Sequence, residues 1–179
     1  RPPYNQQRAD PEGYLYIRAS GSAGLALSTT RRAPGWLRDP GKAPNCDERL
    51  VIGPFRRRSS ARAAVEALQR CYPIRHCPRG LDLRPCARAA TGACLSPCTG
   101  APDAREANDS LVTDLLLWLA GRTPAGEAAD PLRRCSEVIN ELERMGAHQE
   151  ARAVSDGCEH LVVIRRAYRK LAEACQLCF

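Results

Sequence analysis

Four cysteines gather in one short part of the chain, with the spacing Cys77-x8-Cys86-x7-Cys94-x3-Cys98. Thiolates are soft ligands, and four of them can close a tetrahedral zinc site or hold an iron–sulfur cluster. Structural zinc sites usually use two cysteine pairs with short gaps, and only Cys94 and Cys98 form such a pair here. Wide spacing and the prolines beside Cys77 and Cys98 favour a cluster. On spacing alone, zinc and uncoordinated thiols stay open as alternatives.

The composition argues against disulfides. The chain has 179 residues, of which 44% are hydrophobic, so it can bury a core without the cross-links that small secreted domains need. Residues 1–10 are polar and do not resemble a signal peptide. The longest apolar run, Leu115 to Ala120, is far shorter than the ~18 residues of a membrane span. We therefore expect a cytoplasmic protein with no membrane segment. Because the chain begins at Arg1 and not at Met, we interpret it as a fragment.

Positive charge is concentrated in the first half of the chain. The net charge is +7, and residues 1–90 contain 17 Arg and Lys against 7 Asp and Glu. Such a surface suits a polyanion, and DNA is the obvious candidate. Five arginines beside expected strand ends are candidates for contacts with phosphate: Arg31, Arg32, Arg56, Arg57 and Arg58. The plain alternative is that Arg31 and Arg32, and likewise residues 56–58, lie in solvated turns without a partner.

The elements around the cysteines predict an α+β fold. Residues 13–20, 24–30 and 49–55 read as strands, and "GSAG" is a turn between the first two. A helix follows with Ser59 or Ser60 as its N-cap, and Pro73 ends it. Residues 1–72 are therefore expected to form a small basic unit, a β-meander with one helix. Residues 74–100 show neither helical nor strand periodicity, and a loop of this length needs something to organise it.

The remainder of the chain reads as helical. Asp103 is expected to cap a helix that ends at Leu119, and Asp130 to cap another with Pro131 at its first position. A last helix begins near His148 and reaches about Leu177. Its apolar stripe and that of the preceding helix predict an antiparallel hairpin. We thus divide the chain into residues 1–72, a four-cysteine segment at 73–101, and a helical region at 102–179.

Six cysteines lie outside the four-cysteine group. Cys135, Cys158 and Cys175 fall on apolar helix faces and are most simply small core residues. Cys175 and Cys178 have the spacing of a redox or zinc half-site, but no partner pair is evident. No role is predicted for Cys46 or Cys71.

Several short segments carry a resemblance to a known family. "RPPYN", "YLYIRAS", "IGPF", "CYPIRHC", "RPC" and "GACLSPC" occur in this order. The series resembles the part of UvrC, the bacterial excision-repair endonuclease subunit, that follows its GIY-YIG nuclease domain. It is also similar to the corresponding region of the Cho endonuclease and of actinobacterial fusions of a DnaQ-type exonuclease to a GIY-YIG domain. The resemblance covers Arg1 to about Met145, and the cysteine block is its most specific part.

The resemblance implies a cofactor. In this family the four cysteines hold a [4Fe-4S] cluster, which implies the same role for Cys77, Cys86, Cys94 and Cys98, with zinc as a possible substitute. The gap between Cys77 and Cys86 is shorter than is usual in UvrC, and a loop can shorten in this way without loss of ligation.

The resemblance also bears on activity and partners. "PPYN", with Asn5, matches only the last active-site motif of the GIY-YIG domain, so this chain is not expected to cut DNA itself. Residues 145–156, "MGAHQEARAVSD", fall where the family has a UvrB-binding hairpin. His148 or Gln149 replaces the usual Phe and Ser155 an Arg, so the hairpin is expected but UvrB binding is in doubt.

We therefore expect a non-catalytic, cluster-bearing DNA-binding module that positions an upstream GIY-YIG domain of a repair nuclease. The expected location is the cytoplasm, in association with the nucleoid. The alternative is a protein-interaction module in which the helical hairpin docks a partner and the four-cysteine site is purely structural. An exposed apolar stripe between Asp130 and Leu177 would favour this alternative.

Overall fold

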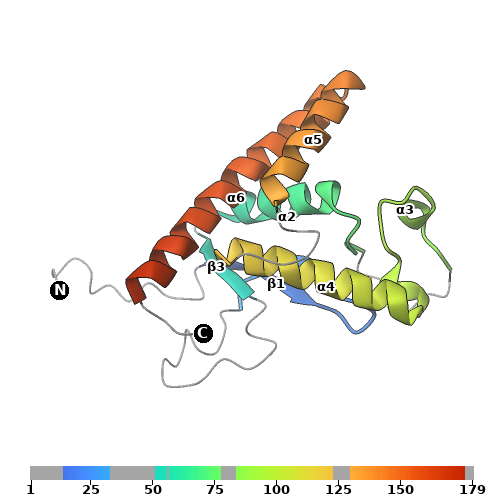
Figure 1. The fold of residues 1–179 in the computed structure, drawn as a ribbon, viewed down its shortest axis with the longest axis horizontal. Helices are drawn as coiled ribbons and strands as arrows, with labels where there is room; N and C mark the ends of the chain where they lie inside the picture. The colour runs from blue at the N-terminus through green and yellow to red at the C-terminus, as the bar shows by residue number, and fades with distance from the viewer. Residues whose placement is uncertain (1–13, 33–50, 56, 78–83, 123–129, 176–179) are drawn as a thin grey trace.

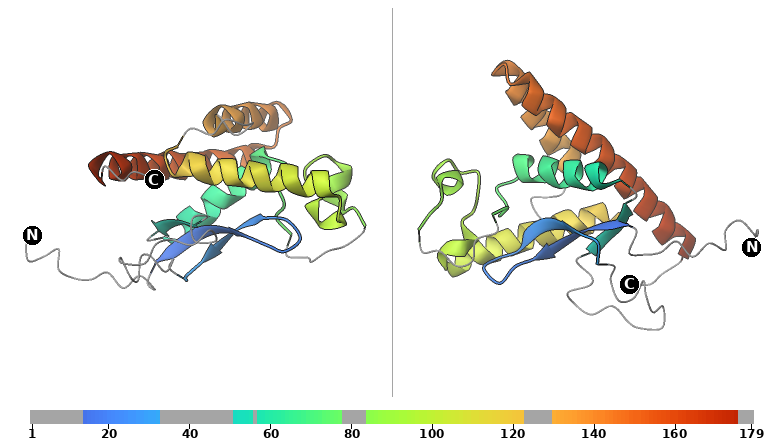
Figure 2. Two further views of the ribbon diagram at one scale, coloured as in Figure 1. Left: turned by 60° about the horizontal axis from the view of Figure 1, so that its bottom comes forward. Right: turned by 180° about the vertical axis from the view of Figure 1, so that it is seen from behind.

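The computed structural model describes residues 14–32, 51–55, 57–77, 84–122 and 130–175. In these residues a small sheet lies beneath a group of helices, and the helices gather on one side of it (Figure 2). The predicted α+β class is confirmed to that extent. No helix among the described residues is long and apolar enough to cross a membrane.

The sheet has three antiparallel strands: β1 (Leu15–Ser20), β2 (Ala26–Thr30) and β3 (Val51–Phe55). The three strands match the predicted ones, but the order is β2-β1-β3. The predicted meander is therefore wrong, because β3 pairs with β1 and not with β2. Only a tight turn forces consecutive strands to pair, and β1 and β2 alone are joined by one. The long connection to β3 lets it take the free edge of β1.

Helix α2 (Arg58–Cys71) packs on the sheet through small and aliphatic side chains. Its buried face has helical spacing and consists of Ala61, Ala64, Val65, Ala67, Leu68 and Cys71. The N-cap is Arg57, whose side chain makes no capping hydrogen bond, so the predicted caps Ser59 and Ser60 are wrong. Both serines lie inside the first turn because the helix begins immediately after the strand, before either of them.

Helix α4 (Pro102–Leu119) runs beside the sheet (Figure 1). It begins two residues earlier than expected, because Pro102 occupies its first turn and Ala101, not Asp103, is the N-cap. The predicted cap Asp103 therefore lies inside the first turn of the helix. Its negative charge there interacts favourably with the positive end of the helix dipole.

Helices α5 (Pro131–Arg144) and α6 (His148–Cys175) form the predicted antiparallel hairpin (Figure 1). Asp130 caps α5 as expected, since its carboxylate accepts a hydrogen bond of 3.1 Å from the Arg133 amide. Met145 continues the apolar spacing of α5 and would be predicted to face inward, but it is 63% exposed. It follows the last residue of α5, so its side chain lies beyond the surface that α6 covers.

One continuous cluster of buried hydrophobic side chains joins the sheet to α2, α4, α5 and α6. Ile17 from β1, Leu68 from α2, Leu115 from α4 and Leu161 from α6 are all fully buried in it. The division of the chain into three segments stays a prediction.

Asn108 on α4 is fully buried and joins two distant parts of the chain. Its Oδ1 accepts a hydrogen bond of 2.9 Å from the Arg75 amide, and its Nδ2 donates one of 2.9 Å to the Leu25 carbonyl. The Arg75 guanidinium donates to the Gly24 carbonyl at 2.7 Å, and Asp109 accepts from the Leu25 amide at 2.6 Å. We call these contacts the Asn108 network. It ties the β1–β2 turn and the segment that leads to Cys77 to a single helix.

Gly157 marks the closest approach of α6 to α2. A Cβ atom at this position would lie 2.5 Å from the Ala63 carbonyl oxygen and 2.5 Å from the Ala67 Cβ. A glycine inside a helix costs about 1 kcal/mol relative to alanine. Here the missing Cβ lets the two helices meet, so tertiary packing outweighs the local preference.

We expect Gly157→Ala to destabilise the protein, although alanine is the better helix former. The new methyl group forces α2 and α6 apart, at a cost of about 1–3 kcal/mol. Urea unfolding followed by circular dichroism measures the change. Ala153→Gly, at an exposed position of the same helix, should cost only about 1 kcal/mol. Stabilisation by Gly157→Ala would contradict the close packing.

We expect Asn108→Leu to lower the free energy of unfolding by about 3 kcal/mol, since a buried group without a partner costs roughly 1–3 kcal/mol. The leucine fills a similar volume but satisfies neither the Arg75 amide nor the Leu25 carbonyl. Asn140→Leu on the exposed face of α5 is the matched control and should change stability by less than about 0.5 kcal/mol. Equal effects of the two substitutions would show that the network contributes nothing.

Candidate functional site

The cysteine segment contains two short helices that its sequence does not predict. Cys86 is the N-cap of α3 (Ala87–Ala90), and Cys98 lies in η4 (Pro97–Thr99), a single turn of 3-10 helix. Within the segment, the Leu95 amide donates a 2.8 Å hydrogen bond to the Pro73 carbonyl. The Arg88 guanidinium ties the segment to α2 through a 3.1 Å hydrogen bond to the Gln69 carbonyl. Gly24 of the β1–β2 turn lies against Pro97, where a Cβ atom would come within 2.6 Å of the proline Cβ.

The four thiols differ in exposure, and the other three lie within electrostatic reach of Cys94. Cys94 and Cys98 are buried, and Cys77 and Cys86 are half-buried. Burial raises the pKa of Cys94, and the Cys86 and Cys77 thiols raise it further. Burial also raises the pKa of Cys98, with Cys77 the largest neighbouring contribution. The fold therefore brings the four sequence-predicted cysteines into one neighbourhood.

The described residues contain no group of three or more His, Cys, Asp or Glu side chains arranged to hold a metal ion. The four cysteines are all described, so they share a neighbourhood without forming a finished coordination shell.

Three groups near the four cysteines favour the deprotonated thiolate, which is the form that binds a metal. The Ser96 amide donates to the Cys94 sulfur at 3.4 Å, a contact made possible by the left-handed conformation of Ser96 (φ 56°). Hydrogen bonds of this kind stabilise thiolates. Arg88 lowers the pKa of Cys94 and Arg75 that of Cys98, although burial outweighs both effects. The donor set and its surroundings therefore fit a thiolate-bound metal or cluster.

Two buried polar atoms in this neighbourhood have no hydrogen-bond partner among the described residues: Ser96 Oγ and Arg88 Nε. The Arg88 guanidinium also donates to the Gln69 and Ala93 carbonyls, at 3.1 and 3.0 Å. Buried donors without partners are rare in folded proteins and call for an acceptor. The sequence predicted no role for Arg75, Arg88 or Ser96, although Arg75 stands inside the segment "CYPIRHC".

The basic residues converge at one end of the sheet. Thr30, the last residue of β2, pairs with Tyr16, and Phe55, the last residue of β3, pairs with Leu15. The two strands therefore terminate at the same end of the sheet, on either side of β1. Their ends are about 10 Å apart, because neighbouring strands are ~4.8 Å apart. Arg31 and Arg32 follow β2, and Arg57 and Arg58 follow β3.

The side chains of these four arginines are exposed. Arg57 and Arg58 also stand at the N-terminus of α2, where the helix presents free amides and positive potential. We call Arg31, Arg32, Arg57 and Arg58 the basic edge. The fifth predicted arginine, Arg56, lies outside the described residues.

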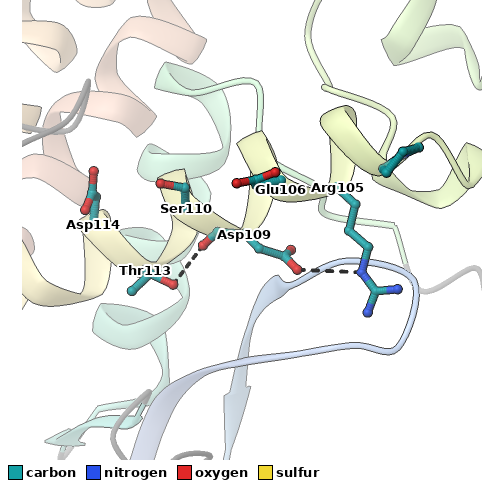
Figure 3. A pocket seen from close by; sticks show the side chains of 7 residues that line it. Arg105, Glu106, Asp109, Ser110, Thr113 and Asp114 are labelled. Carbon is teal, nitrogen blue, oxygen red and sulfur yellow. Dashed lines mark hydrogen bonds and ion pairs between the residues drawn. The ribbon is translucent and has the colours of Figure 1, made fainter.

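An open groove of about 550 Å³ runs along the outer face of α4 (Figure 3). Glu106, Asp109 and Asp114 line it together with a single arginine, Arg105, which forms an ion pair of 3.8 Å with Asp109. The excess of carboxylates repels phosphate, so this groove does not suit a nucleic acid.

As far as the structure describes the side chains of the helical hairpin, its apolar residues pack mostly within the chain. Ala151, Val154, Leu161 and Ile164 of α6 are buried, and the apolar residues of α5 pack against the same core. Among the described residues only Met145 and Val163 are exposed large hydrophobic side chains. The feature that would favour a docking hairpin is therefore reduced to two separate side chains.

Comparison with known sequences identifies the region that carries these features. The profile of the UvrC/Cho excinuclease middle domain matches residues 25–113, which include the four cysteines and the basic edge. The chain is similar to UvrABC system protein C of Halobacterium salinarum, at 30% identity over 164 residues, with 88% of this chain and 25% of the relative covered.

Two further relatives give the same result. UvrABC system protein C of Haloquadratum walsbyi is 29% identical over 160 residues, with 86% of this chain and 25% of the relative covered. That of Sodalis glossinidius is 24% identical over 159 residues, with 86% and 24% covered. The chain thus spans about a quarter of the length of these relatives. No solved structure matches it. The chain therefore contains a UvrC-like region, in which residues 25–113 correspond to the middle domain of the UvrC/Cho excinuclease family.

Proposed function

We propose that this chain is a non-catalytic, cluster-bearing DNA-binding module of a UvrC-like repair nuclease. The observation that carries the proposal is the shared neighbourhood of four thiols and two arginines, Arg75 and Arg88, inside the UvrC middle domain. The module would position a GIY-YIG nuclease domain on DNA, as the family resemblance implies. A cytoplasmic, nucleoid-associated location is part of the same proposal.

The residues proposed to hold a [4Fe-4S] cluster are Cys77, Cys86, Cys94 and Cys98. A cluster would supply four covalent cross-links within a segment that otherwise has only short helices to organise it. Deprotonated thiols and a cluster carry negative charge, which the nearby guanidinium groups of Arg75 and Arg88 would offset. Zinc is a possible substitute because it accepts the same four thiolates.

The basic edge is proposed to contact the DNA backbone. Its two pairs of exposed arginines flank the central strand, and the amides at the start of α2 add a further site for phosphate. Such contacts give affinity without sequence preference and release counterions, so binding weakens as salt rises. A UvrB-type partner belongs to the same family context, and its binding through residues 145–156 stays a weaker proposal.

The alternative is a protein-interaction module with a purely structural metal site. It draws on the same four cysteines but needs an exposed apolar face on the hairpin. Because α5 and α6 bury their apolar stripes against the core of this chain, the DNA-binding proposal is favoured.

Anaerobic purification should yield about four irons and four sulfides per chain, with a broad absorption at about 400 nm. Cys94→Ser or Cys86→Ser should remove most of the iron. Cys158→Ser, at a cysteine on α6 outside the segment, is the control and should retain it. Zinc without iron would reduce the site to scaffolding and shift support to the interaction alternative. A chain that binds neither iron nor zinc would overturn the cofactor proposal.

Replacing Arg57 and Arg58 together by alanine should weaken binding to duplex DNA several-fold at low salt. For each phosphate that an arginine no longer neutralises, the slope of log K against log salt should also become less steep by about 0.9. Fluorescence anisotropy across a salt series measures both quantities. Arg133→Ala with Arg152→Ala, on exposed positions of the hairpin, removes the same charge elsewhere. An equal loss of affinity in both double variants would show that net charge, and not the basic edge, governs binding.

A further inference from the structure

Three cysteines outside the four-cysteine segment meet where three helices cross. Cys71 is the last residue of α2, Cys135 lies on α5 and Cys158 on α6. The sulfurs of Cys71 and Cys135 are 3.4 Å apart and hydrogen bonded, and Cys135 is also hydrogen bonded to Cys158. Figure 1 shows the hairpin of α5 and α6 crossing over α2.

The three thiols differ in their exposure to solvent. Cys71 and Cys135 are 2% and 1% exposed, whereas Cys158 is half-buried and is the one a solute can reach. The hydroxyl of the neighbouring Tyr72 is buried without a hydrogen-bond partner among the described residues. This part of the core therefore contains three thiols and a buried hydroxyl group in place of purely apolar side chains.

The surroundings of Cys135 and Cys158 keep these two thiols protonated. The hydrogen bond with Cys158 favours the Cys135 thiolate, but the one with Cys71 and burial outweigh it and raise the pKa of Cys135 to about 12. The hydrogen bond with Cys135, followed by burial, raises the pKa of Cys158. Because the thiolate is the reactive form, Cys135 and Cys158 react slowly at neutral pH and respond to sustained rather than brief oxidation.

We propose that Cys71 and Cys135 form a reversible disulfide that clamps the α5–α6 hairpin to α2, with Cys158 as the thiol that exchanges with small disulfides in solution. A disulfide has an S–S distance of about 2.05 Å, so the two sulfurs need to approach by about 1.3 Å. A second contact holds the same pair of helices together, since the Arg134 Nε donates to the Cys71 carbonyl at 3.1 Å.

The reaction balances with glutathione disulfide as the oxidant. The Cys158 thiolate attacks one sulfur of glutathione disulfide and releases one glutathione. The Cys135 thiolate then displaces the second glutathione from Cys158, which forms a Cys135–Cys158 disulfide. Finally the Cys71 thiolate attacks Cys135 and releases Cys158 as a thiol. In total, two protein thiols lose two electrons and two protons, and one glutathione disulfide becomes two glutathiones.

The clamp joins residues 64 positions apart in sequence. A cross-link over a loop of this length restricts the unfolded chain and raises stability. It also prevents the hairpin from separating from α2. This inference does not depend on the proposed cluster or on DNA binding, since none of its three cysteines belongs to the four-cysteine segment.

The test equilibrates the full chain with mixtures of glutathione and glutathione disulfide, alkylates the remaining thiols and maps disulfide-linked peptides by mass spectrometry. We expect a Cys71–Cys135 peptide that dithiothreitol reverses, and a higher melting temperature for the oxidised form. Cys158→Ser should slow its formation at least tenfold without abolishing it. Cys71→Ser should shift the cross-link to Cys135 and Cys158.

The matched control moves one thiol by a single residue. Cys135→Ser combined with Ser136→Cys keeps the number of cysteines but places the thiol at an exposed position of α5, so the cross-link to Cys71 should disappear. Circular dichroism confirms that each variant is folded. The proposal is overturned if the wild-type chain gives no Cys71–Cys135 peptide at equilibrium. It is also overturned if the peptide forms equally in the control, or equally in denaturant, where the fold no longer holds the thiols together.

Discussion

A single buried amide side chain, Asn108, determines how the parts of this protein meet. Its two polar ends satisfy the Arg75 amide, two residues before Cys77, and the Leu25 carbonyl in the β1–β2 turn. Buried backbone groups without partners are costly, so this arrangement is strongly preferred over any that separates the three elements. Hydrogen bonds thus hold the cysteine segment and the β1–β2 turn against α4, beside the apolar core that joins the sheet to the helices.

The same network places positive charge beside the thiols. Arg75 is only 4% exposed, and its guanidinium is oriented by the Gly24 carbonyl. A buried cation is expensive unless negative groups lie near it. The Arg75 guanidinium favours the Cys98 thiolate, the form that binds a soft metal or a cluster, although burial outweighs this effect and the pKa of Cys98 stays raised. Stability and the proposed chemistry thus draw on one arrangement. The basic edge stands apart from it, because it follows from strand register alone.

The helical hairpin illustrates how packing can override local preference. Gly157 is a poor residue for a helix interior, yet α6 continues through it because the missing side chain admits the Ala63 backbone. The close crossing of α2 and α6 also fixes the positions of the cysteines of α2, α5 and α6 relative to one another. Contacts between sulfurs from three helices are therefore a consequence of helix crossing.

The sequence by itself determined the three strands, the four long helices, the hairpin, the cap at Asp130 and, through its spaced motifs, the UvrC-like region. These features depend on neighbours within a few residues or on motif order, and both can be read along the chain. Only the tertiary structure decided the strand order, the exposure of Met145, the roles of Arg75, Arg88 and Asn108, and the meeting of Cys71 with Cys135. Each of these depends on residues far apart in sequence, and no local periodicity encodes which distant groups will satisfy one another. The convergence of Arg31 and Arg32 with Arg57 and Arg58 belongs to the second kind, because it required the register of both outer strands against β1.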